Sequence, residues 1–306
     1  MSRILKSREW FTADAFPIAV ERREPQSPFP PHSHEFSEIV FIVGGKGRHV
    51  IQRESWPLTA GDVFVIGGSQ VHAYRKLENL RLVNLLFQPE KLRLGKPELA
   101  SLPGYHALFA LEPAWRRRHQ FQSRLHLSPK DLDGVLALVE QLEGELRQRS
   151  PGFGFMATAL FMQIIGRLSR LYGQSHNPST QHLLRLAQTI SQMETKPQES
   201  VKLNDLARQA GMSPRSFIRA FRAATGLSPI AYLIQLRISR AALLLRTSTE
   251  PVTEIAFRVG FNESNYFTRQ FVKLIGCSPR RYRQRQTADE KFPDRLFPPP
   301  ILTGRF

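Results

Sequence analysis

The strongest constraint on how this chain can fold is a pattern that occurs twice in its C-terminal third. In the first copy and then in the second, the matching residues are Leu206-Ala207 and Ile255-Ala256, Gly211 and Gly260, Phe221 and Phe271, Gly226 and Gly276, Ser228-Pro229 and Ser278-Pro279, and Tyr232 and Tyr282. The offset is 49 residues up to the first glycine pair and 50 after it, so we predict one residue inserted at the start of the second copy's long helix. Each copy has the order short helix, glycine turn, longer helix, which is typical of a helix-turn-helix.

Both copies also carry helix-capping residues at equivalent places. In the first copy, Gly211 can take the left-handed conformation that ends a helix, Ser213 can cap the next helix, and Pro214 can open it. In the second copy, we expect Gly260 and Asn262 to have the same roles. The shared capping pattern makes a duplicated helix-turn-helix a far more specific prediction than one helical hairpin would be.

Positive charge is concentrated in the same segment. The 306-residue chain has 43 Lys and Arg against 26 Asp and Glu, a formal net charge of +17. Residues 201–286 contribute 15 basic and 4 acidic residues, a net charge of +11. This charge on a duplicated helical unit predicts double-stranded DNA as the partner. An anionic membrane surface is the alternative, but neither copy sets its basic residues opposite the broad apolar stripe that an interfacial helix requires.

In a helix-turn-helix, the N-terminal half of the second helix enters the major groove, where its side chains reach base edges. The helical period predicts buried faces made of Phe217, Ala220, Phe221 and Ala224 in the first copy and of Tyr266, Phe267, Phe271 and Leu274 in the second. The side chains that face outward are then Arg215, Ser216, Arg219 and Arg222 in the first copy and Ser264, Asn265, Thr268 and Arg269 in the second. One long helix over 229–246 is predicted to hold the two reading heads about 34 Å apart, as successive major grooves on one DNA face require.

Residues 182–285 resemble the DNA-binding domain of the AraC/XylS transcription regulators. The stretch Ile255-Ala-Phe-Arg-Val-Gly-Phe-Asn-Glu-Ser-Asn-Tyr-Phe-Thr-Arg-Gln-Phe271, followed by Gly276-Cys-Ser-Pro-Arg-Arg-Tyr282, is close to that family's signature. The resemblance implies base contacts from Arg215, Ile218, Arg219, Ser264, Asn265, Thr268 and Arg269. Ile218 is apolar, so it is expected to touch a thymine methyl group or no base. Contacts to phosphates, which position without specifying sequence, are predicted for Ser213, Arg222, Arg237, Lys273, Arg280, Arg281 and Arg283.

The first 90 or so residues have the short period of β-strands. Period-two or continuous apolar runs occupy 17–21, 36–43, 48–52, 62–66 and 80–87. Turns are predicted between them at Gly44-Gly45-Lys46-Gly47, Ala60-Gly61-Asp62 and Gly67-Gly68-Ser69. Short strands at this spacing indicate a sandwich or a small barrel. From Ser128, an N-cap followed by Pro129, the period becomes helical, and a second helix over 155–172 completes an antiparallel hairpin.

Two motifs in the β-rich part resemble the cupin motifs. His32-Ser-His34-Glu-Phe-Ser-Glu38 followed by Gly45 has the form H-x-H-x3-E-x6-G. Gly61, Gly67, Ser69 and His72 follow at the second motif's spacing, with Gly67 and Ser69 replacing its Pro and Gly. On a strand, His32, His34 and Glu38 would share a face, and His72 from a neighbouring strand could complete a set of three histidines and one carboxylate. We expect these four residues to bind an effector or to stabilise the fold. A bound divalent metal is the alternative, and no other cofactor is expected.

The N-terminal half also resembles the rhamnose-operon regulators within the AraC/XylS family. The resemblance is carried by His32-Ser-His-Glu-Phe-Ser-Glu-Ile-Val40 and by Leu58-Thr-Ala-Gly-Asp-Val-Phe64. It implies a deoxy-sugar effector, and hydroxyl-rich ligands suit a pocket with several His and Glu hydrogen-bonding groups.

Together these features predict an α+β chain with four parts. Residues 1–125 are expected to form a cupin-like, effector-binding β-barrel and 126–180 a helical dimerisation and linker region whose linker spans 173–180. Residues 181–286 are expected to form an all-α DNA-binding domain of two helix-turn-helix motifs joined by a long helix, and 287–306 a disordered tail.

The predicted function is a sugar-responsive transcription activator, dimeric and cytoplasmic, with RNA polymerase as a further partner and no enzyme activity. The single Cys277 excludes an intramolecular disulfide and fits a reducing compartment, and no apolar run is long enough to span a membrane. Two alternatives stay open. One is a regulator of the same build that senses another small molecule or represses; the other is a metal-dependent cupin enzyme fused to a DNA-binding domain.

Overall fold

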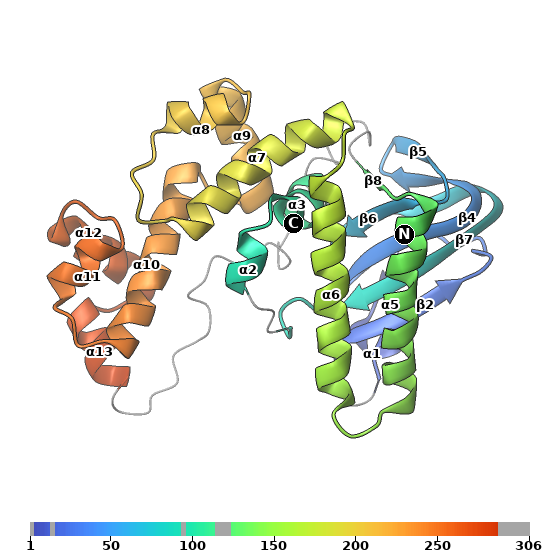
Figure 1. The fold of residues 1–306 in the computed structure, drawn as a ribbon, viewed down its shortest axis with the longest axis horizontal. Coiled ribbons are helices and arrows are strands. Elements are labelled where there is room, and N and C mark those ends of the chain that lie inside the picture. The colour runs from blue at the N-terminus through green and yellow to red at the C-terminus, as the bar shows by residue number, and fades with distance from the viewer. Residues whose placement is uncertain (1–2, 13–15, 93–95, 114–123, 287–306) are drawn as a thin grey trace. The chain divides into compact units, whose positions relative to one another are not determined.

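The computed structural model describes residues 3–12, 16–92, 96–113 and 124–286 of the chain (Figure 1). Internal contacts divide the chain into an N-terminal unit, which ends at Ala187, and a C-terminal unit, which begins at Gln188. This division lies inside helix α7 (Pro178–Thr195), and the predicted linker over 173–180 therefore includes the first turn of a helix. The predicted tail over 287–306 lies outside the described residues.

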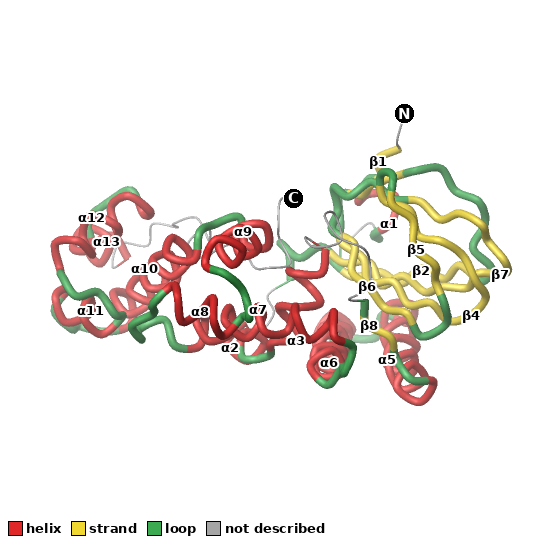
Figure 2. Tube along the Cα trace, turned by 90° about the horizontal axis from the view of Figure 1, so that it is seen from above, coloured by secondary structure: helices red, strands yellow, loops and turns green. Residues whose placement is uncertain are grey.

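The N-terminal unit is built on a curved antiparallel sheet, seen in yellow in Figure 2. Its strands lie in the order β2 (Ile18–Arg23), β7 (Ala73–Phe87), β4 (Ser37–Ile51), β6 (Asp62–Ile66) and β8 (Leu125–His126), and β5 (Glu54–Leu58) also pairs with β4. A small parallel pair, β1 (Arg3–Leu5) and β3 (His32–His34), is joined to the end of the larger sheet by a backbone bridge between His32 and His72. The predicted mixed fold with an N-terminal antiparallel sheet is confirmed.

Glycines in strand β4 make irregularities in the strand and not the turn that the sequence suggested. The prediction of two strands separated at residues 44–47 is wrong, because β4 continues through this stretch with register shifts against β7. Gly45 has a φ of +70°, and a Cβ there would lie 1.9 Å from the Asn79 carbonyl oxygen. Glycine is needed here because the backbone of β7 approaches too closely for any side chain.

Helices α5 (Pro129–Gln148) and α6 (Phe153–Gly173) form the predicted antiparallel hairpin. The Ser128 hydroxyl accepts a hydrogen bond from the Asp131 amide, which confirms the predicted N-cap. Phe161 of α6 packs on Phe87 of β7 with ring centroids 5.3 Å apart, and Arg22 of β2 pairs with Glu143 of α5 at 2.9 Å. Four short elements, α1 (Ser7–Trp10), α2 (Lys96–Ala100), α3 (Pro103–His106) and η1 (Ala107–Leu111), complete the described part of this unit.

The C-terminal unit consists of two copies of one helical arrangement. In the first copy, α8 (Leu203–Gln209) and α9 (Pro214–Thr225) lead into α10 (Pro229–Thr247); in the second, α11 (Val252–Arg258) and α12 (Ser264–Ile275) lead into α13 (Pro279–Gln286). Corresponding helices α8 and α11 are 7 residues long, and α9 and α12 are 12 residues long. The duplicated helix-turn-helix is therefore confirmed. In neither unit does a described helix combine the length and apolar character needed to cross a membrane.

The extra residue of the second copy lies in its turn. Gly211 is followed by two residues before α9 begins, whereas Gly260 is followed by three before α12 begins. The prediction that the helix itself gained a residue is wrong, and so is the cap predicted for Asn262. The N-cap of α12 is Glu263, whose side chain makes no capping hydrogen bond. A turn tolerates an insertion because it has no helical ladder to interrupt.

Candidate DNA-binding surface and effector cavity

Helices α9 and α12 each rest on an aromatic core of its own, and the two cores are built alike. In the first copy, Phe221 lies between Phe217 and Tyr232, with ring centroids 5.6 and 5.4 Å away. In the second copy, the corresponding rings are Phe267, Phe271 and Tyr282, with centroid distances of 5.6 and 5.5 Å. Each of these six side chains is buried. Because the supports match so closely, α9 and α12 present equivalent outer faces.

Helix α9 exposes all three of its side chains that are predicted to contact bases. Arg215, Ile218 and Arg219 are exposed, and Ser216 is half-buried because its amide donates to the Ser213 hydroxyl at the N-cap. Phe217, Ala220, Phe221 and Ala224 form the buried face, as predicted. The basic side chains therefore project from the first two turns of the helix, near the end whose dipole attracts phosphate.

Helix α12 agrees with the prediction in part. Asn265 and Arg269 are exposed, Ser264 and Thr268 are half-buried, and Phe267 and Phe271 are buried. Tyr266 and Leu274, which the helical period placed in the core, are exposed by 37% and 44%. The Arg269 guanidinium lies 5.9 Å from the centre of the Tyr266 ring, so this tyrosine supports an arginine on the outer face. No sequence signal indicated that role, because Tyr266 adjoins the buried Phe267.

The predicted phosphate contacts fall into two groups. Ser213, Arg222, Lys273, Arg280 and Arg281 are exposed, as a phosphate contact requires. Arg237 and Arg283 are half-buried and bind the protein itself. Arg283 Nη2 donates to the Glu250 carbonyl at 2.6 Å, and Arg237 is held in the same way by two carbonyls. The structure gives these two arginines partners within the protein, and the phosphate role predicted for them stays a prediction.

Arg237 of α10 joins this helix to the segment over 196–202, which precedes α8. Its Nε donates to the Pro197 carbonyl at 2.7 Å and its Nη2 to the Glu199 carbonyl at 2.9 Å. Burial lowers the pKa of this guanidinium from its ordinary value. A Cβ on Gly260 would lie 2.7 Å from the Gln198 carbonyl oxygen, so the same segment also packs on the turn of the second copy. The two helix-turn-helix copies are thereby linked through α10 and through the segment over 196–202.

A cavity opens in the N-terminal unit among β2, β4, β7 and the chain's first residues. Its interior space for water-sized molecules is about 40 Å³, and the empty space reaches about 470 Å³ only when the open solvent at its mouth is included. The lining residues are Leu5, Trp10, Glu21, Arg23, Gln26, Phe29, His32, Phe36, Glu38, Tyr74, Asn84 and Leu86. Two of the four predicted effector-binding residues, His32 and Glu38, are among them. The remaining lining residues could not be predicted from the sequence, because they come from separate segments of the chain that share no motif.

Polar and aromatic groups alternate around this cavity. Arg23 pairs with Glu21 at 3.0 Å, and its guanidinium lies 5.7 Å from the centre of the Trp10 ring. Trp10 Nε1 and Asn84 Oδ1 are buried without a hydrogen-bond partner among the described residues. One is a donor and the other an acceptor, and both are in side chains that line the cavity. A ligand with hydroxyl groups could satisfy both atoms.

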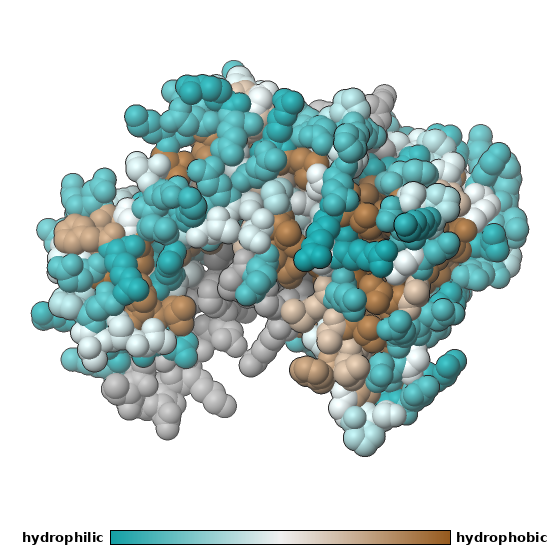
Figure 3. Space-filling model, in the orientation of Figure 1, coloured by the Kyte–Doolittle hydropathy of each residue, from teal (hydrophilic) through white to brown (hydrophobic). Residues whose placement is uncertain are grey.

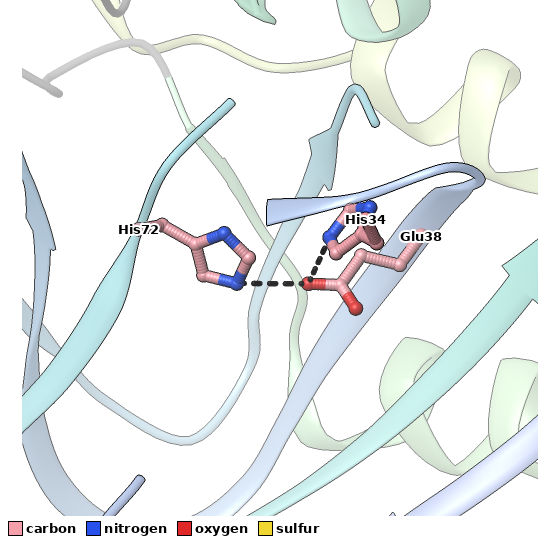
Figure 4. A group of neighbouring side chains, drawn as sticks. All are labelled: His34, Glu38 and His72. Atoms are coloured by element: carbon pink, nitrogen blue, oxygen red, sulfur yellow. Dashed lines mark ion pairs between the residues drawn. The ribbon is translucent and has the colours of Figure 1, made fainter. Parts of the chain in front are cut away.

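Three of the four predicted metal ligands converge beside the cavity. One potential ligand atom from each of His34, Glu38 and His72 lies within 4.8 Å of the others (Figure 4). His32 does not join this set. Its Nδ1 lies 3.0 Å from the Pro30 carbonyl, and its ring packs against that of His72 in a tilted arrangement, with centroids 4.3 Å apart. The chain breaks its strand between β3 and β4, so the single strand face expected for His32, His34 and Glu38 does not exist.

The charges in this cluster follow from burial. Burial, with a smaller electrostatic contribution from the neighbouring His72 ring, lowers the pKa of His32 to about 4, so His32 is uncharged at neutral pH. Burial alone would raise the pKa of the Glu38 carboxyl, but His34 and His72 hold it below its ordinary value. The cluster thus places an ionised carboxylate against two imidazoles. Such a donor set fits the divalent metal that the cupin resemblance implies, with three protein ligands in place of four.

Two protein families match the chain. A family described as an AraC-like ligand binding domain matches residues 17–212, and one described as a helix-turn-helix domain matches residues 206–285. The first match contains the larger sheet and the helical hairpin, and the second runs from within α8 into α13. Each match therefore falls on one of the two candidate sites.

Curated relatives match over nearly the whole chain. The HTH-type transcriptional activator RhaR of Mannheimia succiniciproducens is 32% identical over 92% of this chain and 96% of its own length. The protein of the same name from Klebsiella pneumoniae is 32% identical over 93% of this chain and 98% of its own.

Solved structures also match. The DNA-binding domain of the global transcriptional factor AdpA, in complex with a target DNA, is 36% identical and covers 34% of this chain and 94% of that one, with a TM-score of 0.33. An apo structure of a ToxT variant from Vibrio cholerae is 14% identical and covers 90% of this chain and 98% of that one, also with a TM-score of 0.33.

Proposed function

Because the chain belongs to the AraC family of transcription regulators, we propose that it activates transcription at a specific DNA site when a neutral sugar occupies its N-terminal cavity. The observation that carries this proposal is the pair of matched, basic recognition helices in a chain whose other unit holds a polar cavity. The relatives that match more than nine-tenths of this chain are named transcriptional activators. The chain is therefore a regulator and not an enzyme.

On DNA, we expect α9 and α12 to enter successive major grooves. The N-terminal turns of α9 would read bases through Arg215 and Arg219, with Ile218 against a thymine methyl group, and those of α12 through Asn265 and Arg269, with Ser264 and Thr268 beside them. Arginine bonds to guanine and asparagine to adenine through paired hydrogen bonds. The exposed Ser213, Arg222, Lys273, Arg280 and Arg281 would contact phosphates and fix the register.

Arg219→Ala is expected to weaken binding to the specific site by about 1–3 kcal/mol and to relax preference at one base pair, because Arg219 is assigned to a base edge. Arg281→Ala, at an assigned phosphate contact, should weaken specific and random duplexes alike and reduce the slope of log affinity against log salt by about 1. Titrations of the full chain on a selected site and on a scrambled duplex at several salt concentrations measure both effects. Equal losses on the two duplexes for Arg219→Ala contradict its assigned role.

The effector chemistry follows from the cavity. The paired Arg23 and Glu21 largely neutralise one another, and Trp10, Phe29 and Phe36 offer apolar surface. Trp10 Nε1 and Asn84 Oδ1 need a partner that both accepts and donates hydrogen bonds. A neutral ligand with hydroxyl groups on one face and an apolar face on the other meets these demands, and a deoxy-sugar such as L-rhamnose has that character.

A thermal-shift screen of neutral monosaccharides tests this class of effector. A sugar at 100 times its Kd is expected to stabilise the full chain by about 2.7 kcal/mol. Asn84→Ala should weaken binding of that sugar by about 1–3 kcal/mol, because a sugar hydroxyl loses its buried acceptor. Asn204→Ala, at an exposed position of α8, is the control that should leave the sugar response unchanged. If acidic or purely apolar compounds stabilise the protein and monosaccharides do not, the proposed class is wrong.

We also propose that the regulator works as a homodimer in the cytoplasm and contacts RNA polymerase. Apolar surface gathers over the lower half of α6 in Figure 3, and this helix exposes Phe155 by 79%, Met156 by 47% and Met162 by 37%. Such a surface is typical of a face that another protein covers. Sedimentation of the full chain, and of a Phe155→Ser variant, distinguishes dimer from monomer.

A further inference from the structure

The meeting point of His34, Glu38 and His72 carries chemistry that a sugar sensor does not by itself require. The histidine side chains are 0% exposed and the glutamate side chain is 5% exposed. Glu38 Oε1 lies 3.6 Å from His34 Nε2 and 3.4 Å from His72 Nε2, as Figure 4 shows. His34 Nε2, His72 Nε2 and Glu38 Oε1 have no hydrogen-bond partner among the described residues, so all three atoms are buried, polar and aimed at one another.

The outer nitrogen of each imidazole fixes its tautomer. His34 Nδ1 lies 2.6 Å from the Phe36 carbonyl, and His72 Nδ1 lies 3.1 Å from the Gln70 carbonyl. A carbonyl only accepts hydrogen bonds, so Nδ1 is the nitrogen that donates and carries the proton. A neutral imidazole then presents a lone pair at Nε2. Two lone pairs and a carboxylate oxygen therefore face one another, which is favourable only with a positive charge between them.

The two separations from Glu38 Oε1, 3.4 and 3.6 Å, are close to the edge of a metal coordination shell, and all three atoms lie within 4.8 Å of one another. Bonds of about 2.0–2.2 Å from a first-row divalent metal to His nitrogen and carboxylate oxygen put neighbouring ligand atoms roughly 3–3.5 Å apart in a tetrahedral site. The backbone carbonyls that hold the outer histidine nitrogens are the partners that metal-binding histidines commonly have. Two histidines and one carboxylate also leave coordination positions open for a further oxygen ligand.

We propose that His34, Glu38 and His72 bind one divalent transition-metal ion at the wall of the effector cavity, and that hydroxyl oxygens of the effector complete its coordination. The second part rests on the proposed function, because Glu38 belongs both to the cluster and to the cavity lining. The ion would neutralise a buried carboxylate and give the cavity a point of attachment for adjacent hydroxyl groups. Binding of effector and metal would then be mutually favourable.

Metal titration of the full chain tests the site without any effector. After dialysis against a chelator, we expect one Co²⁺ per chain to bind with a visible absorption band, and Zn²⁺ to displace it. Glu38→Gln and His72→Gln should each lower the Co²⁺ affinity by about 100-fold or more, beyond the 10–100-fold typical of losing a residue that only supports a ligand. Circular dichroism shows that the variants remain folded.

Two histidine variants outside the cluster are matched controls. His49 is buried with its ring 5.6 Å from that of His72, and His176 is exposed; His49→Gln and His176→Gln should both keep the Co²⁺ band. Absence of stoichiometric Co²⁺ and Zn²⁺ binding overturns the site and favours a protonated imidazole as the counter-charge of Glu38. Equal Co²⁺ affinity in the wild type, Glu38→Gln and His72→Gln overturns it as well, since the ion must then bind elsewhere.

Thermal shifts with and without metal test the link to the effector. A stabilising sugar should lose at least tenfold in apparent affinity when the protein is metal-free, and addition of Zn²⁺ should restore it. An unchanged sugar affinity in the metal-free protein overturns the link while sugar sensing stands. If every sugar is inactive with metal present, sugar sensing and the link both fail, and the Co²⁺ titration still decides the metal site.

Discussion

Phe271→Ala is expected to lower the free energy of unfolding of the C-terminal unit by about 3–5 kcal/mol. The Phe271 side chain is fully buried between Phe267 and Tyr282, and no smaller residue can fill the space it leaves. Its removal loosens α12, so contacts of the second helix-turn-helix with DNA should be lost together with stability. Chemical denaturation followed by circular dichroism measures the first effect, and footprinting on the DNA site measures the second.

The matched control for this change is Phe257→Ala. Phe257 lies on α11 of the same copy but is 48% exposed, so its loss should cost well under 1 kcal/mol and leave the footprint intact. The first helix-turn-helix has its own core around Phe221, and its half of the footprint should persist in Phe271→Ala. Loss of both halves at a temperature where the chain remains folded would show that the two copies do not bind as separable heads.

Asp62→Ala is expected to destabilise the N-terminal unit by about 3 kcal/mol. The Asp62 carboxylate is fully buried and accepts hydrogen bonds at 2.8 Å from the Thr59 amide, Arg124 Nε and His126 Nδ1. Arg124 and His126 lie in and beside β8, which connects the sheet to α5 through Ser128. Removing the buried carboxylate takes an ion-pair partner from Arg124 and His126, and the partial exposure of both side chains moderates the cost.

Hydrogen exchange distinguishes this anchoring role from a general loss of stability. In Asp62→Ala, the amides of β8 and the first turn of α5 should exchange faster than those of β4 and β7. Asp133→Ala removes an exposed carboxylate from the same end of α5 and should change neither stability nor exchange in β8. Uniformly faster exchange across the whole sheet would show that Asp62 does not act locally.

The C-terminal unit was predictable because its signals are local. A helix-turn-helix is defined by a glycine turn, a cap and a helical period, all within about twenty residues, and Ser213 and Pro214 have the predicted places. The repeat supplied each prediction a second time. The errors arose where two local signals compete, as at Tyr266, where an aromatic residue at a core spacing is instead exposed beneath Arg269.

The N-terminal unit was harder because β-pairing joins residues that are distant in the sequence. Residues 44–47 have the composition of a turn, yet pairing with the neighbouring strand β7 keeps them within one long strand, with irregular register. The cavity draws on Trp10, Arg23, Glu38 and Asn84, and no spacing rule connects these positions. The cupin motifs correctly identified four residues as neighbours. A motif cannot specify which three of them bring their ligand atoms together, because that depends on how the strands pack.

By itself, then, the sequence determined much of the DNA-binding unit: its duplication, its charge and most of the side chains that α9 and α12 present. Helical faces repeat every few residues, so local order fixes which side chains share a surface. Only the tertiary structure decided that Arg237 and Arg283 bind backbone carbonyls and that Trp10 and Asn84 line one cavity. It also decided that His34, Glu38 and His72 converge without His32. These outcomes depend on which distant segments pack together, and packing is a property of the whole fold.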